Sequence, residues 1–430
     1  MNLRATRIRA AVRAVDRPLA LLASMAFVVQ IGVAVMLPLL PLYATQFGAT
    51  PFMLGLLTSA HAVTSAVGQL AGGFLTERLA SRRLVAFGIG LYAGANLLIA
   101  TATAALPLIL YRGLAGLGGG INQVSERIYL TEVTDRARRA FSNGILSAAG
   151  AAGSVLGPAI GGLLVVVGDL RVPFLLVAAT SALATVAALY LPRPAAGAEP
   201  AIAASAAEPL ATDPLGDPVG VAAAPTAIEG EPEPDHGRRP LLALFFAQLA
   251  LNAGFGAFIT TYAIFATGTL GWTTVDVGVV FSMFGLGSVV LGPWLARQAD
   301  RTGRRRMAIL GCIPVVCFGL VFAAGAPHVL VYVAAIAGGG GLTGFEASWF
   351  ALLAAETDEG RRGRIFGIIT ALTNLGIVVG ALGAARIWEQ IDIHAAVVVA
   401  AVTFALAGLA MFAYPRDRIA PPAPTAAAVA

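Results

Sequence analysis

The stretch GILSAAGAAGSVLGPAIGG, Gly144–Gly162, places six glycines and one proline inside an apolar run long enough to cross a bilayer. Glycine and proline weaken helices in water. In lipid no water competes for the backbone groups, so a helix tolerates these residues, and small side chains let a second helix approach closely. The stretch therefore predicts a membrane helix built for tight packing against a neighbour.

The rest of the chain has the composition of a membrane protein. Of its 430 residues, 58% are hydrophobic and 12% are charged, whereas about a quarter of the residues of a soluble domain are charged. One crossing needs roughly 20 apolar residues. The runs that satisfy this are 19–43, 54–76, 84–104, 106–127, 141–166, 172–191, 241–267, 275–297, 307–325, 328–352, 364–388 and 393–414. We therefore predict an all-α polytopic membrane protein with twelve transmembrane helices.

Arginine fixes the predicted orientation. All 28 basic residues are arginines, and only Arg171 and Arg386 fall on the side of the spans opposite the termini. Short loops rich in arginine stay in the cytoplasm, so both termini are expected there. The net charge of +5 then reflects topology, and no nucleic-acid partner is expected.

The segment 192–240 breaks the apolar pattern with proline, alanine and acidic residues. This composition is typical of a disordered linker. The predicted organisation is a basic cytoplasmic N-terminus (1–18), a six-helix bundle (19–191), a cytoplasmic linker (192–240), a second six-helix bundle (241–414) and a cytoplasmic tail (415–430).

The two halves repeat one another at a constant shift of 223 positions. ERLASRR (Glu77–Arg83) aligns with DRTGRRR (Asp300–Arg306), and RRAFSNG (138–144) aligns with RRGRIFG (361–367). Gly153 and Gly157 align with Gly376 and Gly380 at the same shift. Such a repeat predicts two pseudo-symmetric bundles with a substrate path between them.

These residues resemble the major facilitator superfamily of transporters, over nearly the whole chain outside the linker. GFLTERLASRR (73–83) resembles the signature loop between the second and third helices, with Glu77 for the usual aspartate and Ala80 for the second glycine. YRGLAGLGGG (111–120) resembles the fourth-helix motif of proton-coupled members. LPLLPLYA (37–44) resembles the first helix of the twelve-span drug:proton antiporter group, whose members often carry an acid in that helix, where this chain has only Gln30.

The opening stretch is similar to the fifth-helix antiporter motif of exporters. Its motif residues are Gly144, Gly153, Gly157, Pro158, Gly161 and Gly162. The resemblance implies that they pack against the eighth helix between the halves and limit leakage. Gly285, Gly287, Ser288 and Gly292 are the expected partners there, and a generic small-residue packing face is the alternative.

The two repeated loops combine carboxylates with arginines at helix ends. Ion pairs between them would hold one conformation and release in another, while the alternative is a positively charged cytoplasmic rim. The candidate gating residues are Glu77, Arg78, Arg82, Arg83, Asp300, Arg301, Gly303, Arg304 and Arg305.

Polar side chains inside the bilayer are costly and usually functional. Candidates for proton coupling are Arg112, Glu126, His61 and Glu346, with structural hydrogen bonding or ion pairing as the alternative for each. Candidates for lining a substrate cavity are Gln30, Asn122, Gln123, Gln248, Asn252, Phe255, Tyr262 and Asn374. For the aromatic residues, a core or lipid-facing position is the alternative.

The sequence contains no lysine and hence no nucleotide-binding loop, and it lacks the spacings of metal-ligand motifs. We expect no cofactor, no metal and no enzymatic activity. The predicted function is proton-coupled export of a small amphipathic compound by a monomer in a bacterial cytoplasmic membrane. An importer or facilitator, a lipid flippase and a non-transporting receptor remain as alternatives.

Overall fold

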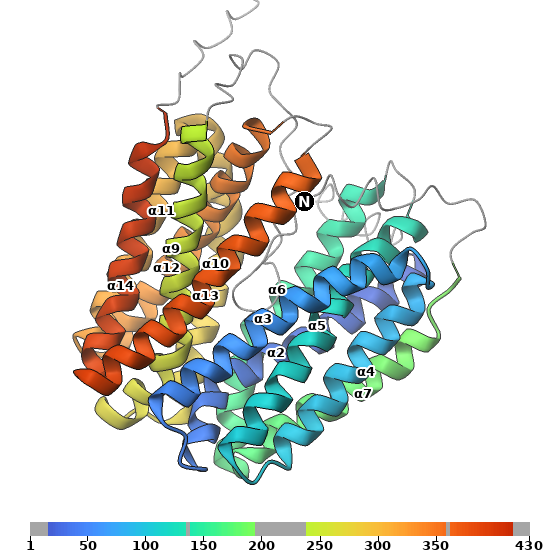
Figure 1. The fold of residues 1–430 in the computed structure, drawn as a ribbon, viewed down its shortest axis with the longest axis horizontal. Coiled ribbons are helices and arrows are strands. Elements are labelled where there is room, and N and C mark those ends of the chain that lie inside the picture. The colour runs from blue at the N-terminus through green and yellow to red at the C-terminus, as the bar shows by residue number, and fades with distance from the viewer. Residues whose placement is uncertain (1–15, 135–137, 194–237, 358–361, 416–430) are drawn as a thin grey trace, which may run out of the picture.

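The computed structural model describes residues 16–134, 138–193, 238–357 and 362–415, and in these ranges the chain forms twelve long helices (Figure 1). The first half contains α2 (Arg17–Thr45), α3 (Pro51–Thr76), α4 (Ser81–Ala100), α5 (Ala105–Val133), α6 (Arg139–Val167) and α7 (Arg171–Leu189). The second half contains α9 (Arg238–Ile264), α10 (Thr274–Thr302), α11 (Arg304–Ala323), α12 (His328–Ala355), α13 (Arg362–Gln390) and α14 (Ile393–Ala410). The predicted N-terminus, linker and tail lie almost wholly outside the described residues.

The predicted all-α fold with twelve helices is confirmed. Among the described residues, ten helices are long and apolar enough to cross a membrane. The two long helices that fall short of this are α3 and α5, which carry polar residues such as Gln69 and Arg112 along their length. Their lower hydropathy therefore marks the helices with an internal polar face.

Short polar caps and glycines begin and end the helices. Thr50 accepts a hydrogen bond from the backbone N–H of Met53 (3.3 Å) at the start of α3. Thr273 and Asp276 form a reciprocal capping box at the start of α10. Gly303 has φ of 98° in the loop before α11, whereas the equivalent Ala80 has φ of −59°. The first loop thus adopts a backbone that does not require the glycine missing from its motif.

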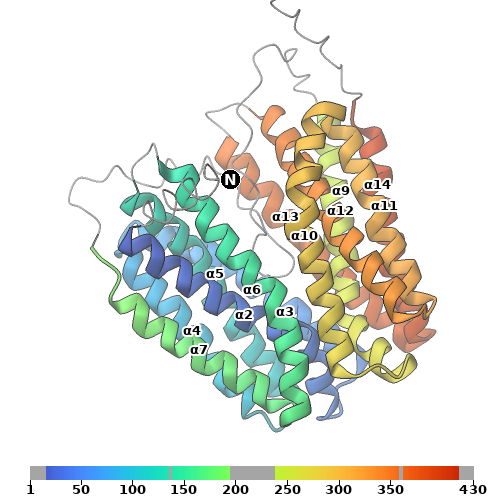
Figure 2. The same cartoon turned by 180° about the vertical axis from the view of Figure 1, so that it is seen from behind.

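Each half is a bundle with its own apolar core, and the two bundles lean together at one end and part at the other (Figures 1 and 2). At the closed end, the last turns of α6 and α13 meet the first turns of α10 and α3. For example, the Thr274 hydroxyl donates to the Gly162 carbonyl (3.2 Å). The Phe52 N–H donates to the carboxylate of Glu389 (3.1 Å).

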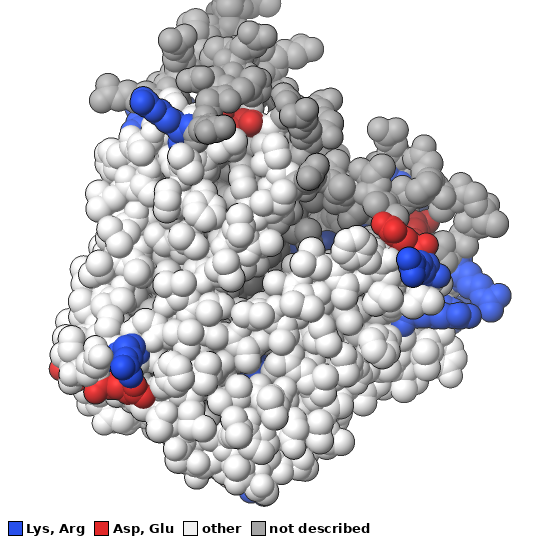
Figure 3. Space-filling view, viewed as in Figure 1, with Lys and Arg blue, Asp and Glu red and all other residues white. Residues whose placement is uncertain are grey.

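The parted end carries the start of α2, the end of α7, the start of α9 and the end of α14 (Figure 1). Figure 3 shows a hollow between the two lobes on this side, with charged side chains gathered near the ends of the bundles and a nearly uncharged band between. The hollow thus lies between the parted ends of the bundles, on the side where α2 begins and α14 ends.

Candidate functional site

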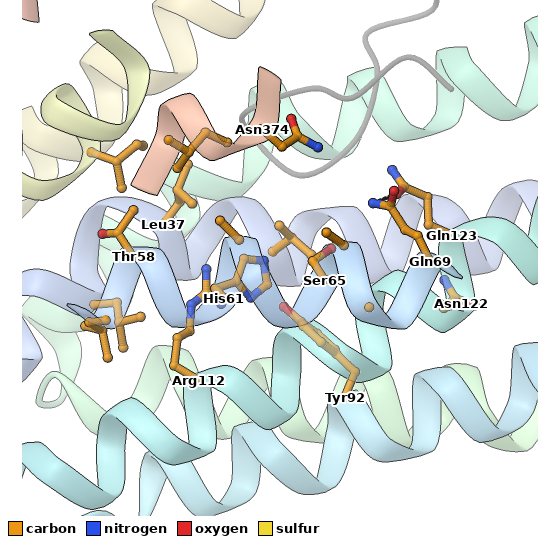
Figure 4. A pocket seen from close by; sticks show the side chains of 18 of the residues that line it. Leu37, Thr58, His61, Ser65, Gln69, Tyr92, Arg112, Asn122, Gln123 and Asn374 are labelled. Carbon is orange, nitrogen blue, oxygen red and sulfur yellow. Dashed lines mark hydrogen bonds between the residues drawn. The ribbon is translucent and has the colours of Figure 1, made fainter. Parts of the chain in front are cut away.

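A cavity of about 140 Å³ lies between the halves, at the middle of the helices that surround it (Figure 4). Its walls come mainly from α2, α3, α4 and α5. The second half contributes Phe255 and Ile259 from α9, and Asn374 and Ile377 from α13. The helices that line it most heavily with polar groups are α3 and α5, which explains why these two are the least apolar.

Glycines of α5 bring its polar face against α3. A Cβ at Gly116 would lie 2.6 Å from the carbonyl oxygen of His61, and one at Gly120 would overlap the carbonyl oxygen of Ser65. A Cβ at Gly118 would lie 2.7 Å from the backbone nitrogen of Tyr92 on α4. Small residues permit such close helix approach. This approach brings side chains from α3, α4 and α5 together at one point.

Arg112 is the charged group at that point. Its side chain is buried, with the residue only 4% exposed, and it points toward His61, as does Tyr92 (Figure 4). Its Nη1 donates to the Met36 sulfur at 3.6 Å, which is a weak acceptor. Within the described residues no carboxylate lies at ion-pair distance from Arg112.

Neutral polar groups continue the cavity toward its open end. The amide of Gln69 donates to that of Gln123 (2.8 Å) and ties α3 to α5. The amide of Gln30 donates to the Ser154 hydroxyl (2.8 Å) and ties α2 to α6. These bonds hold the amides in fixed positions, so this part of the cavity wall is polar without being charged.

The predicted cavity residues divide into two groups. Gln30, Asn122, Gln123, Phe255 and Asn374 line the cavity, and Gln248, Asn252 and Tyr262 do not. The Asn252 amide donates to the Thr373 carbonyl (3.0 Å), so it joins α9 to α13. The hydroxyl of Tyr262 donates to the carbonyl of Val277 (3.1 Å) within the aromatic core of the second half. Gln248 is likewise buried, on α9.

The predicted proton-coupling residues divide in the same way. Arg112 and His61 line the cavity, whereas Glu126 and Glu346 do not. Glu126 is buried one turn from Asn122, whose amide donates to it at 3.4 Å. Glu346 is half-buried within α12. The structure thus brings Arg112 and His61 together and leaves the two carboxylates outside.

The fifth-helix motif, which lies in α6, packs against two helices: against α10 between the halves, as expected, and against α2 within the first half. A Cβ at Gly153 would lie 2.8 Å from the Phe27 carbonyl, and one at Gly157 would lie 2.7 Å from the Ile31 carbonyl, both on α2. Gly161 also faces α2, and a Cβ at Gly144 would meet no atom within 4 Å. Most of the glycine face therefore serves packing within the first half, because its nearest neighbour there is α2.

The motif also meets the eighth helix, α10, on another side, from Ser154 and Val155 to Gly162. Gly278 packs against the Pro158 carbonyl, and Gly162 packs against the start of α10. Of the partners expected from the sequence, Gly285 faces Val155 of α6 at 3.4 Å. Gly287, Ser288 and Gly292 instead face α12, as the bond from the Ser288 hydroxyl to the Gly339 carbonyl (3.0 Å) shows.

The gating candidates lie at the ends of α3 and α10 and the starts of α4 and α11. Glu77 and Arg78 are exposed, and no ion pair to Glu77 occurs among the described residues. Arg83 and Arg301 are exposed as well, and Gly303 and Arg304 are half-buried. Arg82 and Arg305 bind backbone carbonyls of their own halves. The side chain of Asp300 lies outside what the structure describes.

Sequence reasoning missed Thr58, Tyr92, Ile259 and Ile377 as cavity residues. Tyr92 carried a usable signal, because Gly88, Tyr92 and Asn96 recur at steps of four and so share one face of a helix. The apolar residues carried none, since apolar side chains fill every face of a membrane helix.

Two six-helix bundles around a polar cavity at mid-membrane define a solute transporter. The family model described as Major Facilitator Superfamily matches residues 22–243 and 244–429. The chain belongs to this superfamily, whose members are transporters.

Individual relatives are distant. The chain is 27% identical over 165 residues to the quinolone resistance protein NorA of Staphylococcus aureus (strain Mu50), a match covering 38% of this chain and 42% of NorA. It is 21% identical over 359 residues to the uncharacterized MFS-type transporter MJ1560 of Methanocaldococcus jannaschii, covering 83% of this chain and 87% of that one. The crystal structure of the nucleoside transporter NupG superposes with a TM-score of 0.71 at 14% identity, covering 93% of this chain and 100% of NupG.

Proposed function

We propose that this transporter exports a small amphipathic organic compound from a bacterial cytoplasm in exchange for protons, and that it works as a monomer. The observation that carries the proposal is the cavity at the middle of the helices in which Arg112 lies beside His61, between two bundles that meet at one end and part at the other. Both groups face the space where a solute would bind. A change of protonation in this space acts directly on the bound solute.

The arginine distribution supports a cytoplasmic position for the chain ends. The hollow between the bundles would then open inward, and the contacts of α3 with α13 and of α6 with α10 would form the outer seal. Alternating access requires these contacts to part while the chain-end side closes. Among the described residues, few hydrogen bonds cross these helix contacts, which suits a seal that must open repeatedly.

The partial similarity to NorA supports export rather than uptake. Because the match spans 42% of NorA's length, we infer the role of the whole protein from the cavity and the seal together. NorA is named as a quinolone resistance protein, so norfloxacin, a fluorescent quinolone, is chosen as the first probe.

Everted membrane vesicles containing the protein test the proposal. Energised vesicles should accumulate norfloxacin, or another compound found in a growth-inhibition panel, and a protonophore should abolish this accumulation. Arg112→Ala should abolish it too, while Arg193→Ala, at an exposed arginine just after α7, should retain it.

Accumulation that survives collapse of the proton gradient would contradict the coupling. Uptake into whole cells, without protection from any toxic compound, would select an importer instead. Movement of labelled lipid between leaflets of liposomes, unaffected by soluble compounds, would select a flippase.

A further inference from the structure

The cavity holds the charged side chain of Arg112, and among the described residues no carboxylate pairs with it. Its lining includes Arg112 and His61 but no aspartate or glutamate. Burying a cation inside a membrane is expensive unless an anion accompanies it. Within the described residues the recorded acceptor for the Arg112 side chain is the Met36 sulfur at 3.6 Å, so the guanidinium retains unused capacity to donate.

Two more polar groups face Arg112. The Tyr92 hydroxyl and Nδ1 of His61 are buried, and within the described residues neither makes a hydrogen bond of normal geometry, although both residues interact with Arg112. Buried polar groups are normally satisfied, and Figure 4 shows both side chains turned toward Arg112. Three polar groups from α3, α4 and α5 therefore converge on one place, and the cavity lining there includes no carboxylate.

The chemistry of this place favours an oxyanion. A guanidinium binds a carboxylate through two parallel hydrogen bonds, and a tyrosine hydroxyl donates readily to the same group. A cationic ligand would meet Arg112 without any carboxylate in the lining to offset the repulsion.

Apart from Asn374, the wall that the second half contributes to the cavity is apolar. Phe255, Ile259 and Ile377 of the second half face the polar groups of the first. Phe255 also borders a small pocket with only apolar lining, formed with Phe258, Phe281 and Phe318. The rings of a ligand whose polar group lies at Arg112 would therefore extend toward these aromatic side chains, with which they stack favourably.

We propose that the substrates are amphipathic organic anions, in which a carboxylate binds Arg112 and one or two aromatic rings lie against Phe255 and Ile259. This inference rests on the proposed function and names its substrate class. The cavity volume of about 140 Å³ is smaller than the roughly 300–1,000 Å³ typical of pockets for drug-sized ligands. A cavity of this size suits a ligand with only one or two rings.

Three probes of equal shape and different charge test the class directly. The full chain in nanodiscs of neutral lipid is titrated with 2-naphthoate, 2-naphthamide and 2-(aminomethyl)naphthalene, and binding is measured calorimetrically. The naphthoate should bind at least ~10-fold more tightly than the amide or the amine, as expected for a charge-assisted hydrogen bond. Equal or tighter binding of the amine, or no binding of naphthoate at millimolar concentration, would overturn the inference.

Matched variants locate the anion. Arg112→Gln should weaken naphthoate binding by ~10- to 100-fold and leave the amide within ~2-fold, whereas Arg193→Gln, at an exposed arginine just after α7, should change neither. Unchanged naphthoate binding in Arg112→Gln would count against Arg112 as the site. Should this variant fail to fold, Phe255→Ala serves instead and should weaken naphthoate and amide together.

Transport separates this inference from the proposed function. Proton-driven accumulation of a cationic compound but of no anion would leave export intact and remove the anion class. Binding of naphthoate through Arg112 without any proton-driven flux would keep the anion site and remove proton-coupled export.

Discussion

Arg82 and Arg305 hold equivalent positions in the two halves, and each binds the carbonyl end of the last helix in its own bundle. Nη1 of Arg82 donates to the Leu191 carbonyl (2.8 Å), just after α7. Nε of Arg305 donates to the Met411 carbonyl (3.0 Å), just after α14. Carbonyls at a helix C-terminus lack intrahelical partners and carry partial negative charge. In each half, this arginine therefore joins the repeated loop to the end of the last helix of its own bundle.

This arrangement predicts a stability role for the two arginines. Arg82→Gln and Arg305→Gln should each lower stability by about 1–2 kcal/mol, because a charged hydrogen bond and a favourable helix-end charge are lost. In a bundle of this size the apparent Tm should fall by about 2–4 °C per kcal/mol, measured by thermal unfolding in detergent.

Arg83→Gln is the matched control, since Arg83 is exposed in the same loop, and it should leave the Tm unchanged. If Arg82 and Arg305 act mainly as conformational latches, their loss will reduce transport with no change in Tm. That result would contradict the capping role.

Glu389 is predicted to hold the outer seal. Its carboxylate accepts from the Phe52 N–H (3.1 Å) at the positive start of α3, and the two residues belong to different halves. Glu389→Ala should favour the outward-open state. A membrane-impermeant thiol reagent applied from outside should then label Thr58→Cys in the cavity several-fold faster, in a background carrying Cys312→Ser and Cys317→Ser.

Asp392 provides the control for that measurement. It lies close to Glu389 in sequence, but its carboxylate caps α14 within its own half by accepting from the Ala395 N–H (2.7 Å). Asp392→Ala should leave the labelling rate unchanged. Equal rates for the Glu389→Ala variant and the parent would show that the cross-half bond does not govern opening.

Gly278 is predicted to be essential for closure of the same end. A side chain there would overlap the Pro158 carbonyl next to the bond from the Ala159 N–H to the Ser282 hydroxyl (3.1 Å). Gly278→Val should reduce transport by at least ~10-fold while each bundle stays folded, because overpacking of ~1–3 kcal/mol is relieved by parting the halves. Normal transport by Gly278→Val would remove the α6–α10 contact from the mechanism.

The sequence was sufficient to predict the twelve helices, the duplication and most of the polar cavity wall, because each depends on hydrophobic runs or on repeated spacing. It did not reveal which neighbour a glycine face would meet. Periodicity places Gly153 and Gly157 on one side of α6, but α2 and α10 both offer small residues to that side. Polarity alone was also ambiguous, since Asn252 joins two helices whereas Asn374 lines the cavity.

The glycine faces within the halves should control stability rather than transport. Gly153 packs on α2 against the Phe27 carbonyl, and its repeat partner Gly376 packs on α9 against the Leu249 carbonyl. Gly153→Val and Gly376→Val should each cost about 1–3 kcal/mol by overpacking and lower the yield of folded protein in fluorescence-detected gel filtration. Gly150→Val serves as control, since a Cβ at Gly150 would meet no atom within 4 Å. A monodisperse Gly153→Val protein with unchanged Tm but reduced transport would instead assign this face to the moving interface.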